Sequence, residues 1–526
     1  MKTFFTNPWL LPILSGVFIG TSYIPFPPWA SIFGFIPLWL FWEQQTRLKN
    51  IILSAILSTF VFTLIGFNWV TFLLHEFAHT PWFVAGLGML IFALVAHLFV
   101  PVAGVLWFLG RKQKLYSGWQ SILVMGLLTA LALCVIPMLF KWNFGYAWYW
   151  SRIPVYHLAE YIGFSGLSML TILANVPLYF VWQNRHSKRA RTVLMHVVMV
   201  FALLNAFGLS TKAWQPVPDA SFNTLLVQAN IGNAEKMAVE FGRGFYNQIL
   251  NKYQSVTDKG LQEHAGIDID FIMWSETAFP SLLNGKYQNT YLSQQLKNFI
   301  KQRQVALITG AYAQDPKTKL MTNSLFVLDE KGEVQSPYYS KSILLAFGEY
   351  IPGEEQFPVF REWLPMVGHF GRGGGPTELL TLKDYQIGPQ ICYESLYPYF
   401  SKSLADLGAQ FIVNVTNDSW YGTWQEPYQH MIMTLARAVE IRRPLVRVTN
   451  TGISTVVLAS GEILQQSPMH QEWAGLYTVP YLKRPHATFY QRYYSLVPSV
   501  LLGILLLMIL NGFRLRVKKR RTVERT

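Results

Sequence analysis

The chain has 526 residues, of which 51% are hydrophobic and only 14% are charged; soluble globular proteins carry about 25% charged residues. This composition excludes a wholly soluble protein, and the apolar residues concentrate before residue 210 and again near the C-terminus. The net charge of +14 could indicate nucleic-acid binding. The basic residues, however, cluster in short segments beside apolar runs, as in the cytoplasmic loops of membrane proteins, so we expect no nucleic-acid partner.

Eight apolar runs are candidates for membrane spans, each of which needs about 20 residues. The first two are short and separated by prolines, which indicates a hairpin; a cleaved signal peptide is the alternative for the first. Eight spans put both termini on one side. With the N-terminus inside, the basic segments 43–50, 110–117 and 184–192 and the C-terminal tail all fall inside. The runs cover residues 9–23, 29–42, 51–72, 82–109, 122–139, 161–181, 193–209 and 494–513.

The stretch from residue 221 to residue 482 reads as ordinary soluble protein in which short β-rich runs alternate with helical ones. The alternation predicts a layered α/β domain, whose functional groups usually lie just past the carboxyl ends of strands. We expect helices at 291–304 and 428–442, and strands at 224–230, 271–274, 305–310, 324–328, 386–391, 411–415, 445–449 and 454–458.

Three polar or reactive side chains follow these β-rich runs: Glu276, Lys341 and Cys392. Taken singly, they read as a solvated glutamate, a surface lysine and a core cysteine. Taken together, they supply what acyl transfer through a thiol requires, namely a base, a cation that favours the thiolate, and a donor for the oxyanion. The other cysteine, Cys134, lies in an apolar run, so we expect no disulfide.

At these residues the chain resembles the nitrilase, or carbon–nitrogen hydrolase, superfamily, whose triad is Glu–Lys–Cys in this order. It is more closely similar to the bacterial apolipoprotein N-acyltransferase family, in which a nitrilase-like αββα domain is inserted before the last of eight membrane spans. The likeness covers essentially the whole chain. The motifs that carry it are Trp274-Ser-Glu276-Thr-Ala-Phe-Pro280, Lys341 with Phe347-Gly-Glu349-Tyr-Ile-Pro352, Cys392-Tyr-Glu394, Asn417-Asp-Ser-Trp420-Tyr-Gly422 and Arg443-Pro-Leu-Val-Arg447-Val-Thr-Asn450-Thr-Gly452.

The resemblance implies that Glu276 is the general base, Lys341 the oxyanion stabiliser and Cys392 the nucleophile. It also assigns supporting roles. The chain departs from the family at Met237, where a tryptophan usually follows the lysine, and after Lys341, where Ser-Ile-Leu-Leu-Ala stands in place of a basic residue and a proline. Two segments, 354–364 with its aromatic residues and 370–376 with its glycines, could gate access to the site; both could equally be plain surface loops. The supporting residues are Glu349, Tyr393, Glu394, Trp420 and Asn323.

The implied activity is transfer of a fatty acyl group from a membrane phospholipid to the N-terminal amine of diacylated apolipoproteins, without metal or organic cofactor. We expect residues 1–212 to form seven spans, residues 213–488 the catalytic domain, and residues 489–526 the last span and tail. The expected location is the bacterial inner membrane, with a monomeric protein whose termini are cytoplasmic and whose catalytic domain is periplasmic. A membrane-tethered nitrilase-type amidase and a transporter or scaffold with a degenerate domain are the alternatives.

Overall fold

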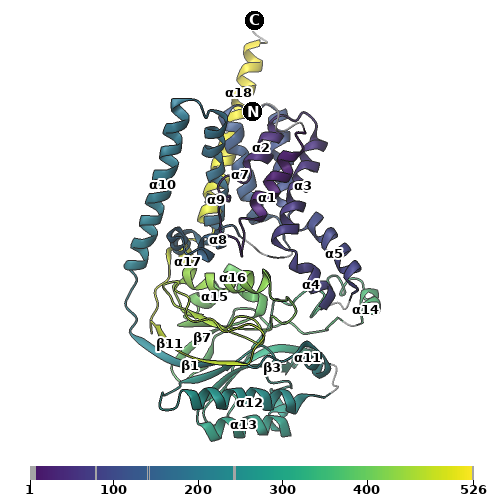
Figure 1. Cartoon of the computed structure of the whole chain (residues 1–526), viewed down its shortest axis with the longest axis vertical. Helices are drawn as coiled ribbons and strands as arrows, with labels where there is room; N and C mark the ends of the chain where they lie inside the picture. The colour runs from purple at the N-terminus through teal and green to yellow at the C-terminus, as the bar shows by residue number, and fades with distance from the viewer. Residues whose placement is uncertain are drawn as a thin grey trace. The chain divides into compact units, whose positions relative to one another are not determined.

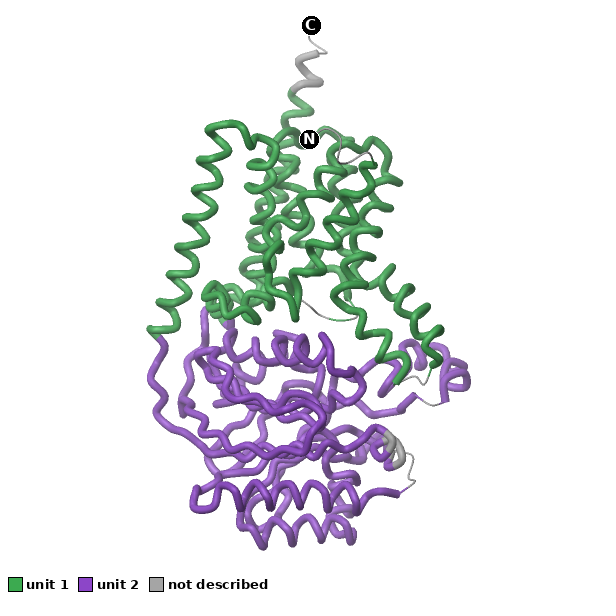
Figure 2. Tube along the Cα trace, viewed as in Figure 1, with its two compact units in different colours: residues 1–214, 492–526 green, residues 215–491 purple. Residues whose placement is uncertain are grey.

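The computed structural model of the chain describes residues 7–76, 80–138, 140, 143–240, 244–365 and 367–523, without the side chains at 234, 237, 238, 240 and 519–523. The chain divides into two compact units (Figure 2). The helical unit comprises residues 1–214 and 492–526, and the α/β unit comprises residues 215–491. Figure 1 shows strands only in the second of these.

The helical unit begins with short helices and ends with longer ones. Among its described residues, five helical stretches are long and apolar enough to cross a membrane: Leu48–Gly66, Trp82–Lys112, Pro154–Gln183, Lys188–Ala213 and Leu496–Lys518. Leu10–Gly20 and Trp119–Val135 are apolar but shorter. The eight-span count therefore stays a prediction. The helices are α1 (Leu10–Gly20), α2 (Ile36–Glu43), α3 (Leu48–Gly66), α4 (Trp69–Glu76), α5 (Trp82–Val95), α6 (Phe99–Lys112), α7 (Trp119–Val135), α8 (Gly145–Trp150), the 3₁₀ helix η1 (Pro154–Leu158), α9 (Ala159–Gln183), α10 (Lys188–Ala213) and α18 (Leu496–Val523).

The second expected span, 29–42, is a regular helix only from Ile36, with Pro37 in its first turn, where a missing N–H is tolerated. The irregular backbone before it is stabilised by the buried amide of Asn175 on α9. Its Oδ1 accepts from the Phe35 amide at 3.0 Å and its Nδ2 donates to the Ser31 carbonyl at 3.2 Å. Backbone groups that would otherwise face an apolar interior are thus paired, as a membrane environment requires.

The α/β unit contains two sheets that lie against each other. The six-stranded sheet has the order β11-β1-β2-β3-β4-β5 and the five-stranded sheet the order β10-β9-β8-β7-β6. Strands β1, β2 and β3 are parallel to one another, as are β7, β8 and β9. The strands are β1 (Ala220–Gln228), β2 (Phe271–Trp274), β3 (Ala306–Gln314), β4 (Met321–Leu328), β5 (Tyr339–Ser340), β6 (Leu380–Leu382), β7 (Tyr385–Ile391), β8 (Phe411–Thr416), β9 (Leu445–Thr449), β10 (Thr455–Val457) and β11 (Trp473–Tyr481).

Helices cover the outer faces of both sheets, which gives the order helix, sheet, sheet, helix (Figure 1). Helix α12 buries one stripe against β1, and at Gly260 the backbones approach so closely that a Cβ would lie 2.7 Å from the Cβ of Ala474. Between the sheets, the rings of Phe222 and Phe411 meet with centroids 4.4 Å apart. The helices are α11 (Asn233–Glu240), α12 (Tyr246–Glu263), η2 (Gly285–Asn289), α13 (Tyr291–Arg303), α14 (Val359–Trp363), η3 (Cys392–Leu396), α15 (Pro398–Asp406), α16 (Glu426–Ile441) and α17 (Phe489–Arg492).

The prediction of a layered α/β domain is confirmed, and each of the eight predicted strands overlaps an observed strand. Both predicted helices occur, as α13 and α16. The last strand, β11, was not predicted, although it is the antiparallel partner of β1 along nine residues. Its outer side chains are half-buried, so the run lacks the continuous apolar character that marks the central strands.

Candidate active site

Glu276 lies two residues past the end of β2, on a turn in the protein interior. It is 6% exposed. The next residue, Thr277, has a φ of +48°, a conformation that β-branched residues rarely adopt. Gly310 on β3 permits this turn, because a Cβ there would lie 2.5 Å from the Thr277 amide and 2.7 Å from the Glu276 Cα. The backbone therefore directs the carboxylate inward at the cost of local strain.

Lys341 follows β5 directly and is buried, with 2% of its surface exposed. Its Nζ lies 3.2 Å from Glu276 Oε1 and 2.9 Å from Glu349, so one ammonium group pairs with two carboxylates. Burial alone would lower the pKa of Lys341, but the adjacent charges of Glu276 and Glu349 outweigh it and raise the pKa well above its ordinary value. The lysine is a fixed cation at this position.

Asn323 on β4 holds the two carboxylates together from another side. Its Nδ2 donates to Glu276 Oε1 at 2.6 Å and to Glu349 Oε1 at 3.3 Å. The other oxygen of Glu349 accepts from the Leu345 amide at 2.8 Å. The structure thus brings together four residues that the sequence indicated separately.

Cys392 begins the 3₁₀ helix η3 immediately after β7, with a φ of +54°. The thiol is 5% exposed and lies within electrostatic range of both Glu276 and Lys341. Burial and the negative charge of Glu276 raise the pKa of the Cys392 thiol well above its ordinary value, although Lys341 opposes them. The resting thiol is therefore protonated, and its attack on a carbonyl requires a base.

Glu394 connects the turn of Cys392 to the strand of Lys341. Its Oε1 accepts from the Ser342 amide at 2.7 Å and from the Tyr339 hydroxyl at 2.6 Å, and its Oε2 accepts from the Ile391 amide at 2.9 Å. Burial raises the pKa of Glu394 even though these donors lower it. Its contacts make it a support for the geometry of the site.

Tyr393 points into the protein interior rather than toward Lys341. Its ring stacks on His430 with centroids 4.9 Å apart, and its hydroxyl donates to Glu426 at 3.2 Å. His430 Nδ1 lies 3.0 Å from Asp418. The donor atoms of Asp418, Glu426 and His430 lie within 4.8 Å of one another, a spacing that could hold a metal ion. Arg447 places its own positive charge 2.7 Å from Asp418 and balances that carboxylate.

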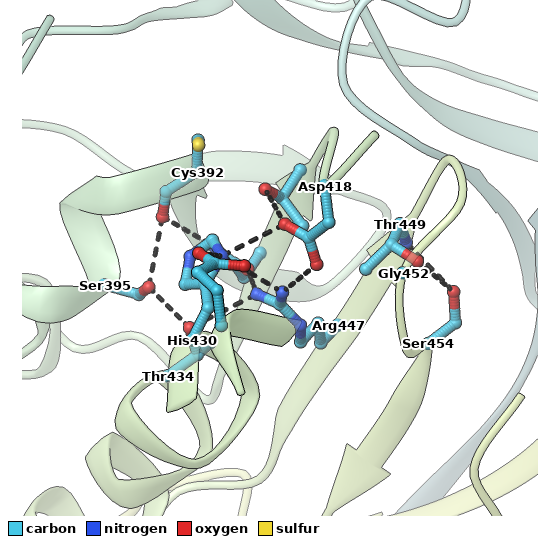
Figure 3. A network of polar contacts seen from close by, with 12 residues as sticks. Cys392, Ser395, Asp418, His430, Thr434, Arg447, Thr449, Gly452 and Ser454 are labelled. Carbon is cyan, nitrogen blue, oxygen red and sulfur yellow. Dashed lines mark hydrogen bonds and ion pairs between the residues drawn. The ribbon is translucent and has the colours of Figure 1, made fainter. Parts of the chain in front are cut away.

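A buried network fixes the carbonyl of Cys392 (Figure 3). Ser395 Oγ donates to this carbonyl at 3.1 Å and Asn414 Nδ2 donates to it at 3.3 Å. Arg447 in turn donates to Asn414 Oδ1 at 2.8 Å and to the Thr434 hydroxyl at 3.2 Å. Sequence reasoning missed Asn414 and Thr434, since one is an ordinary strand residue and the other an ordinary helix residue.

The glycine-rich segment after α14 returns to the sheet beside the site. The Phe370 amide donates to the Glu349 carbonyl at 3.0 Å, and the Gly373 amide donates to the Lys341 carbonyl at 2.8 Å. A Cβ on Gly373 would lie 1.9 Å from the Ser340 carbonyl oxygen, so this approach requires glycine. Before it, the side chain of Trp363 is 69% exposed and that of Phe357 59%.

Two of the indicated positions, Trp420 and Met237, lie on segments outside the cluster of Glu276, Lys341 and Cys392. Trp420 is partly buried in the turn that follows β8. Met237 lies on α11, and its side chain is outside the described residues.

Two packed sheets covered by helices, with Glu276, Lys341 and Cys392 gathered past strand ends, define a domain of the carbon–nitrogen hydrolase class. Residues 220–479 match the family model described as carbon-nitrogen hydrolase, and residues 15–177 match that of the apolipoprotein N-acyltransferase N-terminal domain. The chain belongs to the apolipoprotein N-acyltransferase family. It is 43% identical over 489 residues to the apolipoprotein N-acyltransferase of Bdellovibrio bacteriovorus, covering 91% of this chain and 89% of the relative.

A second relative, the apolipoprotein N-acyltransferase of Geobacter metallireducens, is 29% identical, with 88% of each chain covered. Among solved structures, an amidase from Nesterenkonia sp. is 18% identical, with a TM-score of 0.37, and the match covers 51% of this chain and 93% of that one.

Proposed function

We propose that this chain is a bacterial membrane enzyme that transfers a fatty acyl group from a phospholipid to the N-terminal α-amine of the diacylglyceryl-cysteine of apolipoproteins. The observation that carries the proposal is the buried Lys341 ammonium between Glu276 and Glu349, beside the buried Cys392 thiol. The name of the relatives supplies the acceptor, an apolipoprotein acylated on nitrogen, and the phospholipid donor is part of our proposal. The reaction proceeds in two steps through a thioester.

In the first step the carboxylate of Glu276 takes the proton of the Cys392 thiol as sulfur attacks an ester carbonyl of the phospholipid. A base is needed here because the thiol is protonated at rest. The oxyanion of the tetrahedral intermediate is stabilised by the Lys341 ammonium. The intermediate collapses with cleavage of the C–O bond, Glu276 returns the proton to the alkoxide, and a lysophospholipid leaves.

In the second step Glu276 takes a proton from the α-amine of the lipoprotein, which attacks the thioester carbon. The C–S bond breaks, the amide forms, and the sulfur leaves as thiolate and recovers the proton from Glu276. The same base serves both steps because it is protonated and deprotonated once in each. Lys341 stays charged throughout, since its pKa is raised well above its ordinary value.

The placement of the catalytic groups at a membrane favours transfer over hydrolysis. Donor ester and acceptor amine are both confined to the bilayer, which raises their encounter frequency, and a buried thioester excludes water as a competing nucleophile. We further propose eight spans, with residues 213–488 forming a catalytic domain on the periplasmic side and both termini in the cytoplasm. The support for this orientation is the distribution of basic segments.

The test is the intact mass of the purified full-length protein after incubation with phospholipid. We expect an adduct of one acyl group that hydroxylamine removes, and that is absent in Cys392→Ala. The chain has one other cysteine, so Cys134→Ala is a matched control that keeps the adduct. Addition of a diacylated lipopeptide should discharge the adduct onto the peptide. Release of free fatty acid without peptide acylation would instead indicate a hydrolase.

A further inference from the structure

A second buried ammonium group lies at the general base. Lys236 on α11 is 6% exposed, and its Nζ donates to the backbone carbonyl of Glu276 at 2.9 Å and to the Thr277 hydroxyl at 3.2 Å. We propose that Lys236 is a positioning residue for Glu276, which holds the turn of the base and supplies the second positive charge of the site. This inference rests on the proposed function and adds a residue to it.

Lys236 holds the backbone turn that carries Glu276. Thr277 has a φ of +48°, so the turn that aims Glu276 is strained. A turn of this kind persists only when its surroundings hold it. Lys236 donates to the carbonyl before this residue and to its side-chain hydroxyl, and Gly310 leaves room for the turn on the other side. Lys236 therefore hydrogen-bonds to both residues of the strained turn, Glu276 and Thr277.

Lys236 also adds a positive charge beside Glu276. The titratable groups that face Glu276 are Lys341, Glu349 and Cys392, with Lys236 on its backbone, and Glu394 lies within electrostatic range of Lys341. Two carboxylates thus share one ammonium group and one amide. Lys236, bonded to the backbone carbonyl of Glu276, supplies a second positive charge, which favours the ionised form of carboxylates near it.

Another lysine of the α/β unit bonds a backbone carbonyl away from the site. Lys252 on α12 also donates to a backbone carbonyl, that of Asn230 at 3.1 Å, but its side chain is 35% exposed and lies 3.5 Å from Glu472. These contacts do not involve Glu276 or Glu349. Lys252 is therefore a matched control for a lysine that only caps a carbonyl.

The experiment measures the rate of thioester formation by intact mass, at saturating phospholipid, as a function of pH. We expect Lys236→Met to move the acidic limb of the profile to higher pH by about one unit, which is about a tenfold loss of rate on that limb, with recovery at higher pH. Lys236→Arg, which keeps the charge, should keep the limb in place. Thr277→Val, which removes only the hydroxyl acceptor, should lower the rate without moving the limb. Lys252→Met should change neither.

An unchanged profile for Lys236→Met would overturn the proposal, and so would a uniform loss at every pH with the limb in place, since a purely structural role predicts the latter. If Lys236→Met does not fold, Lys236→Gln, which keeps a donor without charge, is expected to show the same displacement of the limb. Failure of the wild-type protein to form any thioester would instead overturn the proposed function. The two failures are therefore distinguishable.

Discussion

The carboxylate of Glu394 accepts a hydrogen bond from the backbone amide of Ser342 across 2.7 Å. Glu394 follows Cys392 by two residues, and Ser342 follows Lys341 by one. The position of the Lys341 ammonium group relative to the Cys392 thiol is therefore fixed through one buried side chain. The Tyr339 hydroxyl and the Ile391 amide donate to the same carboxylate from two further directions.

Replacing Glu394 by glutamine hardly changes the size of the side chain, but it should strongly reduce the rate of thioester formation. An amide group cannot accept on both sides, so its NH₂ would face a backbone N–H, and a buried donor without an acceptor costs about 1–3 kcal/mol. Because Lys341 then loses its fixed place, we expect thioester formation to fall about 100-fold. Intact mass measures this rate. Tyr339→Phe removes one donor only and should cost less than about tenfold; an unchanged rate in Glu394→Gln would contradict the role given to this carboxylate.

The clamp on the Cys392 carbonyl gives a second prediction. We expect Asn414→Ala to slow thioester formation about tenfold, since the left-handed turn loses a donor and Arg447 loses an acceptor. Ser395→Ala should act through the same carbonyl. A double-mutant cycle on the acylation rate should then show coupling between the two, because their effects converge on one atom. Additive effects would mean that the carbonyl is not what the two side chains control.

Removing the charge of Glu276 should make the Cys392 thiol more reactive toward alkylation while it abolishes acyl transfer. The charge of Glu276 is one of the causes that raise the pKa of the Cys392 thiol, after burial. Glu276→Gln removes that charge, so the pKa falls and a larger fraction of the thiol is ionised at neutral pH. We expect alkylation by iodoacetamide, followed by mass, to be faster in Glu276→Gln while acyl transfer is lost. Slower alkylation would show that Glu276 also acts as the base in this reaction.

Acid should destabilise the α/β unit in two stages. Burial lowers the pKa of His430, so the unfolded chain takes up a proton first, and stability falls as the pH drops below the ordinary histidine value of about 6.5. Burial alone would raise the pKa of Asp418, but Arg447 and His430 lower it to about 2. Its contribution is complete above the ordinary value of about 3.9 and is lost as the pH falls toward 2.

The measurement for the first stage is the thermal unfolding midpoint in detergent between neutral and mildly acidic pH. We expect His430→Gln to flatten the decline, because the group that titrates only in the unfolded chain is gone. His470 is exposed, so His470→Gln is a control that keeps the wild-type slope. An identical slope in all three proteins would remove His430 as the cause.

The central strands and the positions of Glu276 and Cys392 could be predicted because each of these two residues follows a strongly apolar run, whereas Lys341 follows the two-residue strand β5 and was indicated only by its motif. Asn323 and Glu349 could be indicated only by resemblance; the structure places the Asn323 amide against the carboxylates of Glu276 and Glu349, and Glu349 against Lys341. Their catalytic roles stay predictions. Tyr393 was expected among the catalytic or substrate-handling residues, and its position in the motif could not reveal that its ring stacks on His430.

Other parts of the site depend on contacts between distant segments, which no local pattern encodes. Lys236 precedes Glu276 by 40 residues, and Arg447 follows Asn414 by 33. In the helical unit, hydropathy located the apolar runs but not their helix boundaries. Proline interruptions leave α2 with only eight residues, so apolar length alone does not decide which runs span the bilayer.

The return of the glycine-rich segment to the sheet has a consequence for how this enzyme can diverge. The Phe370 and Gly373 amides donate to the main-chain carbonyls of Glu349 and Lys341, and the Phe370 ring and the Arg372 side chain add contacts with Tyr312 and the Ser342 carbonyl, so the segment after the exposed aromatic stretch is held independently of that stretch. Mutations between residues 354 and 364 can therefore alter what the surface offers to an acyl chain without disturbing the catalytic groups. We expect residues 354–364 to be exchangeable between relatives. A hybrid protein that carries a relative's residues at these positions should show that relative's lipid preference while it keeps its own chemistry.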